Sequence, residues 1–337
     1  PCRYRRINHP HRHQHAHQHS REHHNRAPSK FHHPSIVPHS LRLKSMELTV
    51  TRELHPDQLP AIHAVLDAAT SHDGIAPLSE QFLRGLTNPQ HHHFLLYDDT
   101  TIVGIAAYDG ETAELAVTPS ARRHGGATLL IDLMGHKPLW AHGNLQPAQH
   151  FARHLGYTPS RELLVMVIDG DPLTAATAYQ FPDGVELLDL PTAYDRYGSE
   201  TVDQLWLEAN NQAFSWHPEQ GGWDLDRLNQ ARDTDWYRPD DVLTLWENSK
   251  LLGFHWVKRH GDLRAGAKGE VYVVGLGDAG RGRGLGGPLV NAGINRLVAE
   301  GASLVFLYVE ADNEPALRAY QDVGFVVVEH HVLYTRS

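Results

Sequence analysis

The sequence has a single cysteine, Cys2, among its 337 residues. With no second thiol the chain forms no internal disulfide, and residues 46–337 offer neither zinc-finger spacing nor a cysteine nucleophile. Long apolar runs are also missing, because no stretch approaches the roughly 18 consecutive apolar residues of a transmembrane helix. The sequence begins at Pro1, and no apolar stretch that would indicate a secretory signal follows it. These absences predict a cytosolic protein with no membrane partner.

Basic residues are scarce outside the first 45 positions. Residues 1–45 carry nine Lys and Arg against one acid, Glu22, which leaves 21 bases and 39 acids in residues 46–337, a formal balance of −18. A chain this acidic repels a phosphate backbone, so no nucleic-acid partner is expected. The length suits two domains of ordinary size.

The first 45 residues differ from the rest in composition. Eleven of the 27 histidines lie there, among Arg, Gln, Pro and Ser, with almost no apolar periodicity. Such a segment cannot bury enough apolar surface to offset the entropy lost on folding, so we expect 1–45 to be a disordered tail. A second interpretation is chelation of a transition metal by alternating histidines. Those histidines are His13, His15, His17 and His19. No other metal site is expected.

The remaining sequence contains one pattern twice. Residues 110–117 and 269–276 are both β-rich runs, and a basic, glycine-rich hexad follows each of them at the same spacing, an offset of 159. A hairpin precedes each run, with turns at 98–100 and 248–250. A period of about 150 residues indicates a duplicated domain rather than a solenoid repeat.

Both copies predict the same order of elements. A strand leads to one or two helices, a hairpin and the long strand, and the hexad then opens a helix that is followed by an apolar strand, a last helix and a last strand. The predicted fold class is α/β (α+β), with two tandem mixed-sheet domains at 46–168 and 185–337. Turn residues at both ends of 169–184 indicate a linker.

The glycine hexads are the strongest candidates for a ligand site. A strand that runs into glycines and then a helix exposes backbone N–H groups beside the positive end of the helix dipole, which favours phosphate. Two copies in register make a purely structural turn the weaker interpretation. Gly282–Gly287 also fits the dinucleotide pattern G-x-G-x-x-G, but only about 50 residues follow it, too few for the rest of such a sheet. The hexads are Arg122, Arg123, His124, Gly125, Gly126 and Ala127, and Arg281, Gly282, Arg283, Gly284, Leu285 and Gly286.

These features resemble a known family. The hexad after a long strand resembles the acetyl-coenzyme A pyrophosphate loop of the GNAT N-acetyltransferases. Four segments of the second copy, at 217–223, 253–258, 269–275 and 307–313, are similar to the mycothiol synthases, a tandem-domain group of that family. The resemblance implies acetyl-coenzyme A as co-substrate, no metal, and a monomer whose partner is a small thiol precursor. The implied reaction acetylates the cysteinyl amine of desacetylmycothiol.

The resemblance also implies roles for individual residues. Glu270 faces the substrate amine, and Tyr320 protonates the departing thiolate, since a phenol with a pKa near 10 can donate to a thiolate. Without the family, Glu270 is an exposed strand-end carboxylate and Tyr320 a core aromatic. The implied coenzyme site contains Val274, Gly275, Leu276, Gly287, Asn313 and Arg318 with the second hexad, and Leu115, Ala116 and Val117 with the first. The implied substrate site contains Glu80, Glu219, Lys258, Glu270 and Tyr308.

The first copy keeps the coenzyme-binding parts and lacks the proton donor. The aligned pairs are Ala152 with Tyr320, Leu145 with Asn313, and Glu111 with Glu270. We therefore expect the first copy to bind acetyl-coenzyme A without transferring acetyl, and to complete the substrate cleft of the second.

Two departures from the family pattern predict a looser coenzyme loop. Gly277-Asp278 stands where the family usually has Asp-Pro, and the segment at 299–303 is short. Two other functions stay open at this point. One is a GNAT enzyme that acetylates another small amine or a protein N-terminus, and the other is a non-catalytic module that binds acetyl-coenzyme A.

Overall fold

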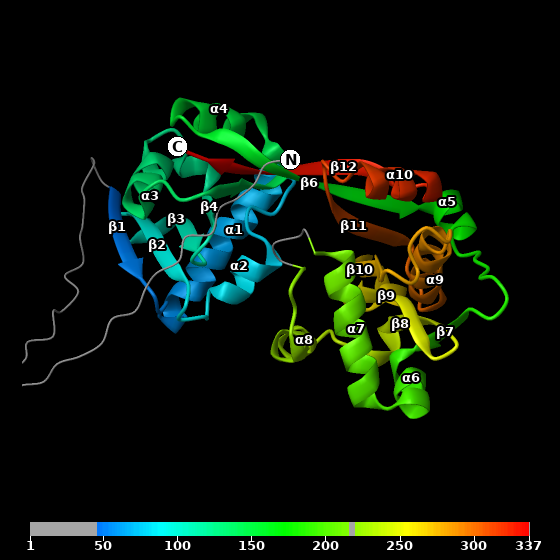
Figure 1. Cartoon of the computed structure of the whole chain (residues 1–337). Helices are drawn as coiled ribbons and strands as arrows, with labels where there is room; N and C mark the ends of the chain where they lie inside the picture. Colours follow the sequence, from blue (N-terminus) through cyan, green and yellow to red (C-terminus); the bar gives the residue numbers. More distant parts are fainter. Residues whose placement is uncertain (1–45, 216–219, 337) are drawn as a thin grey trace, which may run out of the picture. The chain divides into compact units, whose positions relative to one another are not determined.

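Twelve strands form one mixed sheet in the computed structural model, which describes residues 46–215 and 220–336. The predicted tail at 1–45 and its histidines lie outside the described residues. The strand order is β1-β2-β3-β4-β5-β12-β6-β11-β10-β9-β8-β7 (Figure 1). The strands are β1 (Met46–Thr51), β2 (His92–Asp98), β3 (Thr101–Tyr108), β4 (Ala113–Val117), β5 (Leu139–Ala141), β6 (Thr158–Asp169), β7 (Glu186–Asp189), β8 (Val242–Glu247), β9 (Lys250–Arg259), β10 (Gly269–Leu276), β11 (Leu304–Glu310) and β12 (Val326–Thr335).

Helices pack on both faces of this sheet, as predicted. In the first copy α1 and α2 share an apolar cluster on one face, and α3 and α4 share another with different strand residues. In the second copy α6 and α7 form one cluster, and α5, α9 and α10 another. The helices are α1 (Leu59–Asp73), α2 (Glu80–Gly85), α3 (Gly126–Met134), α4 (Gln146–His154), α5 (Gly170–Ala175), α6 (Leu190–Tyr197), α7 (Ser199–Ala213), α8 (Leu225–Arg232), α9 (Gly286–Ala299) and α10 (Glu314–Val323). Within the described ranges, no helix is both long and apolar enough to cross a bilayer.

The two predicted hairpins form, and their turns show why. The backbone of Asp99 has φ +52°, and Asn248 and Ser249 have φ +48° and +63°. Asp and Asn tolerate this left-handed region better than most residues, because their short polar side chains hydrogen-bond locally. The turn chemistry in the sequence therefore sets the β2–β3 and β8–β9 registers.

The last strand of each copy lies in the neighbouring copy. β12 pairs antiparallel with β5 of the first copy, and β6 pairs antiparallel with β11 of the second. β6 and β12 also pair with each other along most of their length, in the middle of the sheet (Figure 1, green and red). The sheet therefore crosses the sequence boundary at 168. The range 169–184 begins with the end of β6 and continues into α5.

The exchanged strands supply core residues to the copy that receives them. Met166 and Ile168 of β6 are buried in a cluster with Ile294 and Val305 of the second copy. Val332 of β12 is buried in the main cluster of the first copy. Full burial of one such side chain contributes about 1.5–3 kcal/mol, so the exchange stabilises both copies together. All of the described residues lie within one compact unit.

Candidate active site

Strands β10 and β11 separate in the middle of the sheet. They pair in parallel only at Gly269, Glu270 and Val271, whereas β9 accompanies β10 as far as Leu276. A bulge at Tyr272 marks the point of separation. Among the described residues, no strand pairs with the β11-facing edge of β10 beyond Val271. That edge contains the predicted residues Val274, Gly275 and Leu276, and its polar backbone groups suit an extended ligand that adds as a strand.

The second hexad forms an open loop between β10 and α9. Gly282 and Gly284 have φ +72° and +73°, and the space where a Cβ would stand is empty at both. Leu285 is buried and anchors the loop, and its side chain makes no cap for α9. The first amides of α9 are thus available to an anion beside the positive end of the helix. Arg283 is held by Glu247 at 2.7 Å, and Arg281 by Asp278.

The first hexad has the same layout with a different arginine contact. β4 pairs with β5 only at Ala113, so Leu115, Ala116 and Val117 again follow a separated edge. Gly125 caps α3 with φ +86° and no side-chain cap. Arg122 forms a bidentate pair with Asp73 at 2.7 and 2.8 Å, and this pair holds the pKa of Asp73 below its ordinary value. Arg122 therefore ties α1 to the loop, while Arg123 and His124 are exposed.

Glu270 lies where β10 leaves β11. It is 5% exposed, and its register partners are Lys258 on β9 and Phe306 on β11. Its Oε2 atom is 2.6 Å from Nε2 of His260. His260 is not among the site residues predicted from the sequence. It could have been found from its position two residues after Lys258, because such a residue points to the same face of an extended chain.

A residue of the first copy reaches this site. The carboxylate of Glu80, at the start of α2, accepts a hydrogen bond from Nζ of Lys258 at 2.6 Å. Lys258 is buried and lies 4.6 Å from the ring centre of Trp236. Burial pushes the pKa of Glu80 upward, but the hydrogen bond and charge of Lys258 outweigh it and leave the pKa below its ordinary value. The Glu80 carboxylate is therefore charged near neutral pH.

Tyr308 lies beside Glu270 on the same face of the sheet. Its ring is between those of Phe306 and His331, with centroids 5.8 and 6.0 Å away. Partial burial and the charge of Glu270 raise the pKa of Tyr308 to about 12. The structure thus brings Glu80, Lys258, Glu270 and Tyr308 together, and predicted Glu219 lies outside the described residues.

The predicted proton donor lies on α10. The ring of Tyr320 packs edge-on against Phe325, and burial raises the pKa of Tyr320 to about 12, so its hydroxyl is protonated at neutral pH. The Asn313 side chain caps α10 by accepting from the N–H of Ala316 at 3.3 Å. Arg318 is exposed and pairs with Glu314 one turn earlier.

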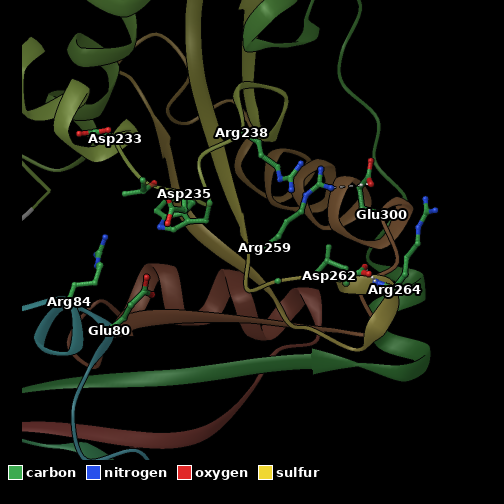
Figure 2. Close-up of a pocket in the computed structure, with 13 residues that line it drawn as sticks. Glu80, Arg84, Asp233, Asp235, Arg238, Arg259, Asp262, Arg264 and Glu300 are labelled. Carbon is green, nitrogen blue, oxygen red and sulfur yellow. Dashed lines mark hydrogen bonds and ion pairs between the residues drawn. The ribbon is translucent and has the colours of Figure 1, made fainter. Parts of the chain in front are cut away.

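A cleft of about 940 Å³ opens at the end of β9. Figure 2 shows Glu80 and Arg84 of α2 on one side, and Arg259 and Glu300, joined at 3.0 Å, on the other. The other lining residues are Asp233, Thr234, Asp235, Trp236, Arg238, Gly261, Asp262, Leu263 and Arg264. The lining is mainly charged, so the cleft suits a polar ligand. Of the predicted site residues Glu80 lines the cleft, and its pair with Lys258 connects the cleft to the Glu270 site.

The alignment of Glu111 with Glu270 is wrong. Glu111 is exposed in the turn before β4, where its N–H donates to Oδ1 of Asp109 at 2.9 Å. The bulge at Tyr272 gives β10 an extra residue that β4 lacks, which shifts the register. The buried carboxylate of β4 is Glu114, which accepts from the N–H of Ser79 at 2.7 Å and so fixes the start of α2.

The alignment of the last helices is confirmed. Leu145 and Asn313 occupy the same N-cap position, before α4 and α10 respectively, and only Asn313 makes a side-chain cap. Ala152 is buried on α4 at the position that Tyr320 has on α10. Among its described residues, the first copy therefore has no hydroxyl at this position.

The fold matches that of solved acetyltransferases. The model of the Acetyltransferase (GNAT) family matches residues 204–325. A tandem GNAT protein from the clavulanic acid biosynthesis pathway superposes with a TM-score of 0.61 at 19% identity, over 86% of this chain and 98% of that protein. A GCN5-related N-acetyltransferase from Sphaerobacter thermophilus gives a TM-score of 0.63 at 21% identity, over 85% and 94%. At these identities the likeness shows the fold alone.

The separated strands, the paired glycine loops and these matches define a tandem GNAT acetyltransferase. Relatives with higher sequence identity to this chain show which family within that class it belongs to. The mycothiol acetyltransferase of Corynebacterium efficiens is 48% identical over 84% of this chain and 94% of the relative. That of Corynebacterium diphtheriae is 49% identical over 81% and 92%. The chain belongs to the mycothiol acetyltransferase family.

Proposed function

We propose that this protein transfers the acetyl group of acetyl-coenzyme A to the cysteinyl amine of desacetylmycothiol, and that its second copy performs the transfer. The observation that carries the proposal is the position of Glu270. It is a buried carboxylate at the point where β10 and β11 part, between the glycine loop and the polar cleft. Family membership supports the acceptor.

The second copy has the parts that hold acetyl-coenzyme A. The glycine loop and the first turn of α9 would bind the pyrophosphate, with Arg281 and Arg283 adding positive charge. The free edge of β10 would pair with the pantetheine arm, and its N–H groups would polarise the thioester carbonyl. Asn313 and Arg318 would line the far side. The co-substrate supplies an activated acetyl group at this edge.

Glu270 and Tyr320 would handle the protons. An α-amine has a pKa of about 8, so much of it is protonated at neutral pH and cannot attack. Glu270 would accept the ammonium proton, directly or through one water, and free the lone pair. Tyr320, protonated at neutral pH, would donate to the sulfur that leaves, and the second proton that the nitrogen loses as the amide forms would restore the phenol.

Glu80, which lines the cleft, would hold the polar body of the acceptor together with Lys258, Tyr308 and Glu219. Since Glu80 belongs to the first copy, that copy contributes to the acceptor site. By the same proposal the first copy binds acetyl-coenzyme A at Arg122–Ala127 but transfers nothing, because Ala152 replaces the tyrosine.

Mass spectrometry of the product tests the proposal. Desacetylmycothiol with acetyl-coenzyme A should give one acetyl addition on nitrogen, together with free coenzyme A. Cysteine and glucosamine serve as alternative acceptors in the same assay. Faster turnover of another amine would refute the proposed acceptor, and no turnover of any amine would support the non-catalytic module.

A further inference from the structure

A histidine outside the predicted catalytic set contacts the proposed base. His260 follows β9, and its Nε2 atom is 2.6 Å from Oε2 of Glu270. Its backbone N–H donates to the carbonyl of Lys268 at 3.0 Å, and its ring packs on Phe306 with the centroids 5.0 Å apart. Backbone pairing and ring packing thus hold the imidazole against one carboxylate oxygen.

The same imidazole reaches solvent. The His260 side chain is 31% exposed, whereas that of Glu270 is 7% exposed. Within residues 46–215 and 220–336, no hydrogen bond to Nδ1 of His260 is present. The ring therefore connects a buried carboxylate to solvent over a single hydrogen bond.

The proposed reaction gives this connection a purpose. Amide formation removes two protons from the substrate ammonium. One replaces the proton that Tyr320 gives to the departing sulfur, and the other goes to Glu270, which would stay a neutral acid, unable to act again, if it retained that proton. A buried carboxylic acid exchanges protons with water slowly unless a polar group links them. Imidazole suits the link, because its unperturbed pKa of about 6.5 lets it gain and lose a proton near neutral pH.

We propose that His260 relays the substrate proton from Glu270 to solvent, an inference that rests on the proposed function. The N–H bond of the ammonium breaks and the proton bonds to the Glu270 carboxylate. Nε2 of His260 then accepts that proton, and the imidazolium loses one proton to solvent water. One proton leaves the amine and one reaches solvent, so the step balances without any other reactant.

The charges around the ring suit this role. Glu270 on β10 stabilises the imidazolium directly. Glu80 on α2 is also near, since the charge of His260 helps to lower the pKa of Glu80. Lys258 and Arg84 partly neutralise Glu80. The imidazolium is thus held by one carboxylate in direct contact, and the second nearby carboxylate is partly neutralised.

The test compares two substitutions of His260 with a matched control. His260→Gln keeps an N–H donor for Glu270 but cannot take up a proton. We expect its kcat at pH 6.5 to fall about ten- to a hundred-fold, a loss that shrinks above pH ~8 as the amine deprotonates unaided. The KM for acetyl-coenzyme A should not change. In His260→Ala, added imidazole should restore part of kcat. His63→Gln, an exposed histidine on α1, should behave as wild type.

The outcomes separate this proposal from the proposed function. An equal loss of kcat at every pH, with no rescue by imidazole, would show a structural contact and overturn the relay. A wild type inactive with desacetylmycothiol refutes the acceptor instead, and the same variants are then compared on the amine that it does acetylate.

A second readout needs no substrate. In nitrogen-15 NMR spectra, Glu270→Gln should move the Nε2 resonance of His260, because that nitrogen loses its hydrogen-bonded carboxylate partner. An unchanged Nε2 resonance would overturn the contact on which the relay depends, whatever the activity of the enzyme.

Discussion

The ion pair between Glu80 and Lys258 has unequal surroundings, and this predicts which partner matters more for stability. The Lys258 side chain is 6% exposed and lies 4.6 and 5.7 Å from the ring centres of Trp236 and Tyr272. The Glu80 side chain is 46% exposed. Removing the carboxylate leaves a buried ammonium without its ion-pair partner, whereas removing the ammonium leaves a carboxylate that water solvates.

The difference in burial between Lys258 and Glu80 sets the expected losses in the free energy of unfolding. Leaving one charge of a fully buried pair unpaired costs about 3–5 kcal/mol, and two aromatic rings retain about 1–2 kcal/mol of cation–π attraction for the ammonium. Glu80→Gln should therefore lower the free energy of unfolding by about 2 kcal/mol. Lys258→Met keeps the alkyl packing and should cost at most about 1 kcal/mol, as for exposed pairs. The double variant should resemble Lys258→Met alone.

Urea unfolding at pH 7, followed by tryptophan fluorescence, measures all three variants. Because the folded-state pKa of Glu80 is below its ordinary value of 4.5, the pair contributes fully above that value. The contribution is lost as the pH falls through the lower folded pKa, so the difference between wild type and Glu80→Gln should vanish in acid. A larger cost for Lys258→Met than for Glu80→Gln would refute the reasoning.

Three further predictions concern the chemistry. Tyr320→Phe should leave the Kd of acetyl-coenzyme A unchanged and lower kcat about ten- to ten-thousand-fold. Because the pKa of Tyr320 is about 12, this residue should produce no alkaline fall in wild-type kcat below pH ~10. A fall at lower pH that Tyr320→Phe abolishes would contradict that pKa. Glu270→Gln should cost most below pH ~8, where the amine is protonated, and a pH-independent loss would indicate substrate binding alone. Gly284→Asp and Gly125→Asp are matched changes that put negative charge at a phosphate loop, at φ +73° and +86° with open space at both. Gly284→Asp should abolish turnover, and Gly125→Asp should spare much of it. The reverse result would show that the first copy is catalytic.

Much of the local structure is predictable from the sequence because its causes are local. The hairpin turns at 98–100 and 248–250 contain Asp, Asn and Ser, and these residues adopt positive φ in the structure. The second hexad opens α9 and the first opens α3, since glycine permits the backbone turn that joins strand to helix. Alignment of the last helices is also correct, because helix caps are set by neighbouring residues.

The register of paired strands and the choice of partner for each strand and side chain were less predictable from the sequence. The bulge at Tyr272 is one extra residue in a ladder, which nothing in the β-rich run reveals, and it makes the alignment of Glu111 with Glu270 wrong. The contact between His260 and Glu270 was not predicted from the sequence, because it joins the ends of two strands across a turn. The roles assigned to the coenzyme-binding residues, and the division into two domains, stay predictions.

The sequence by itself determined the duplicated pattern, the strand–glycine–helix units and the family, because each depends on residue types at fixed spacing along the chain. Only the tertiary structure decided that β6 and β12 change places between the copies, that Glu80 of the first copy pairs with Lys258 of the second, and that His260 contacts Glu270. The β5–β12 ladder joins Leu139 to Tyr334, and the ion pair joins Glu80 to Lys258. They form because burying the apolar faces of β6 and β12 offsets the entropy of closing such long loops, and a single sequence does not show which distant face a strand will cover.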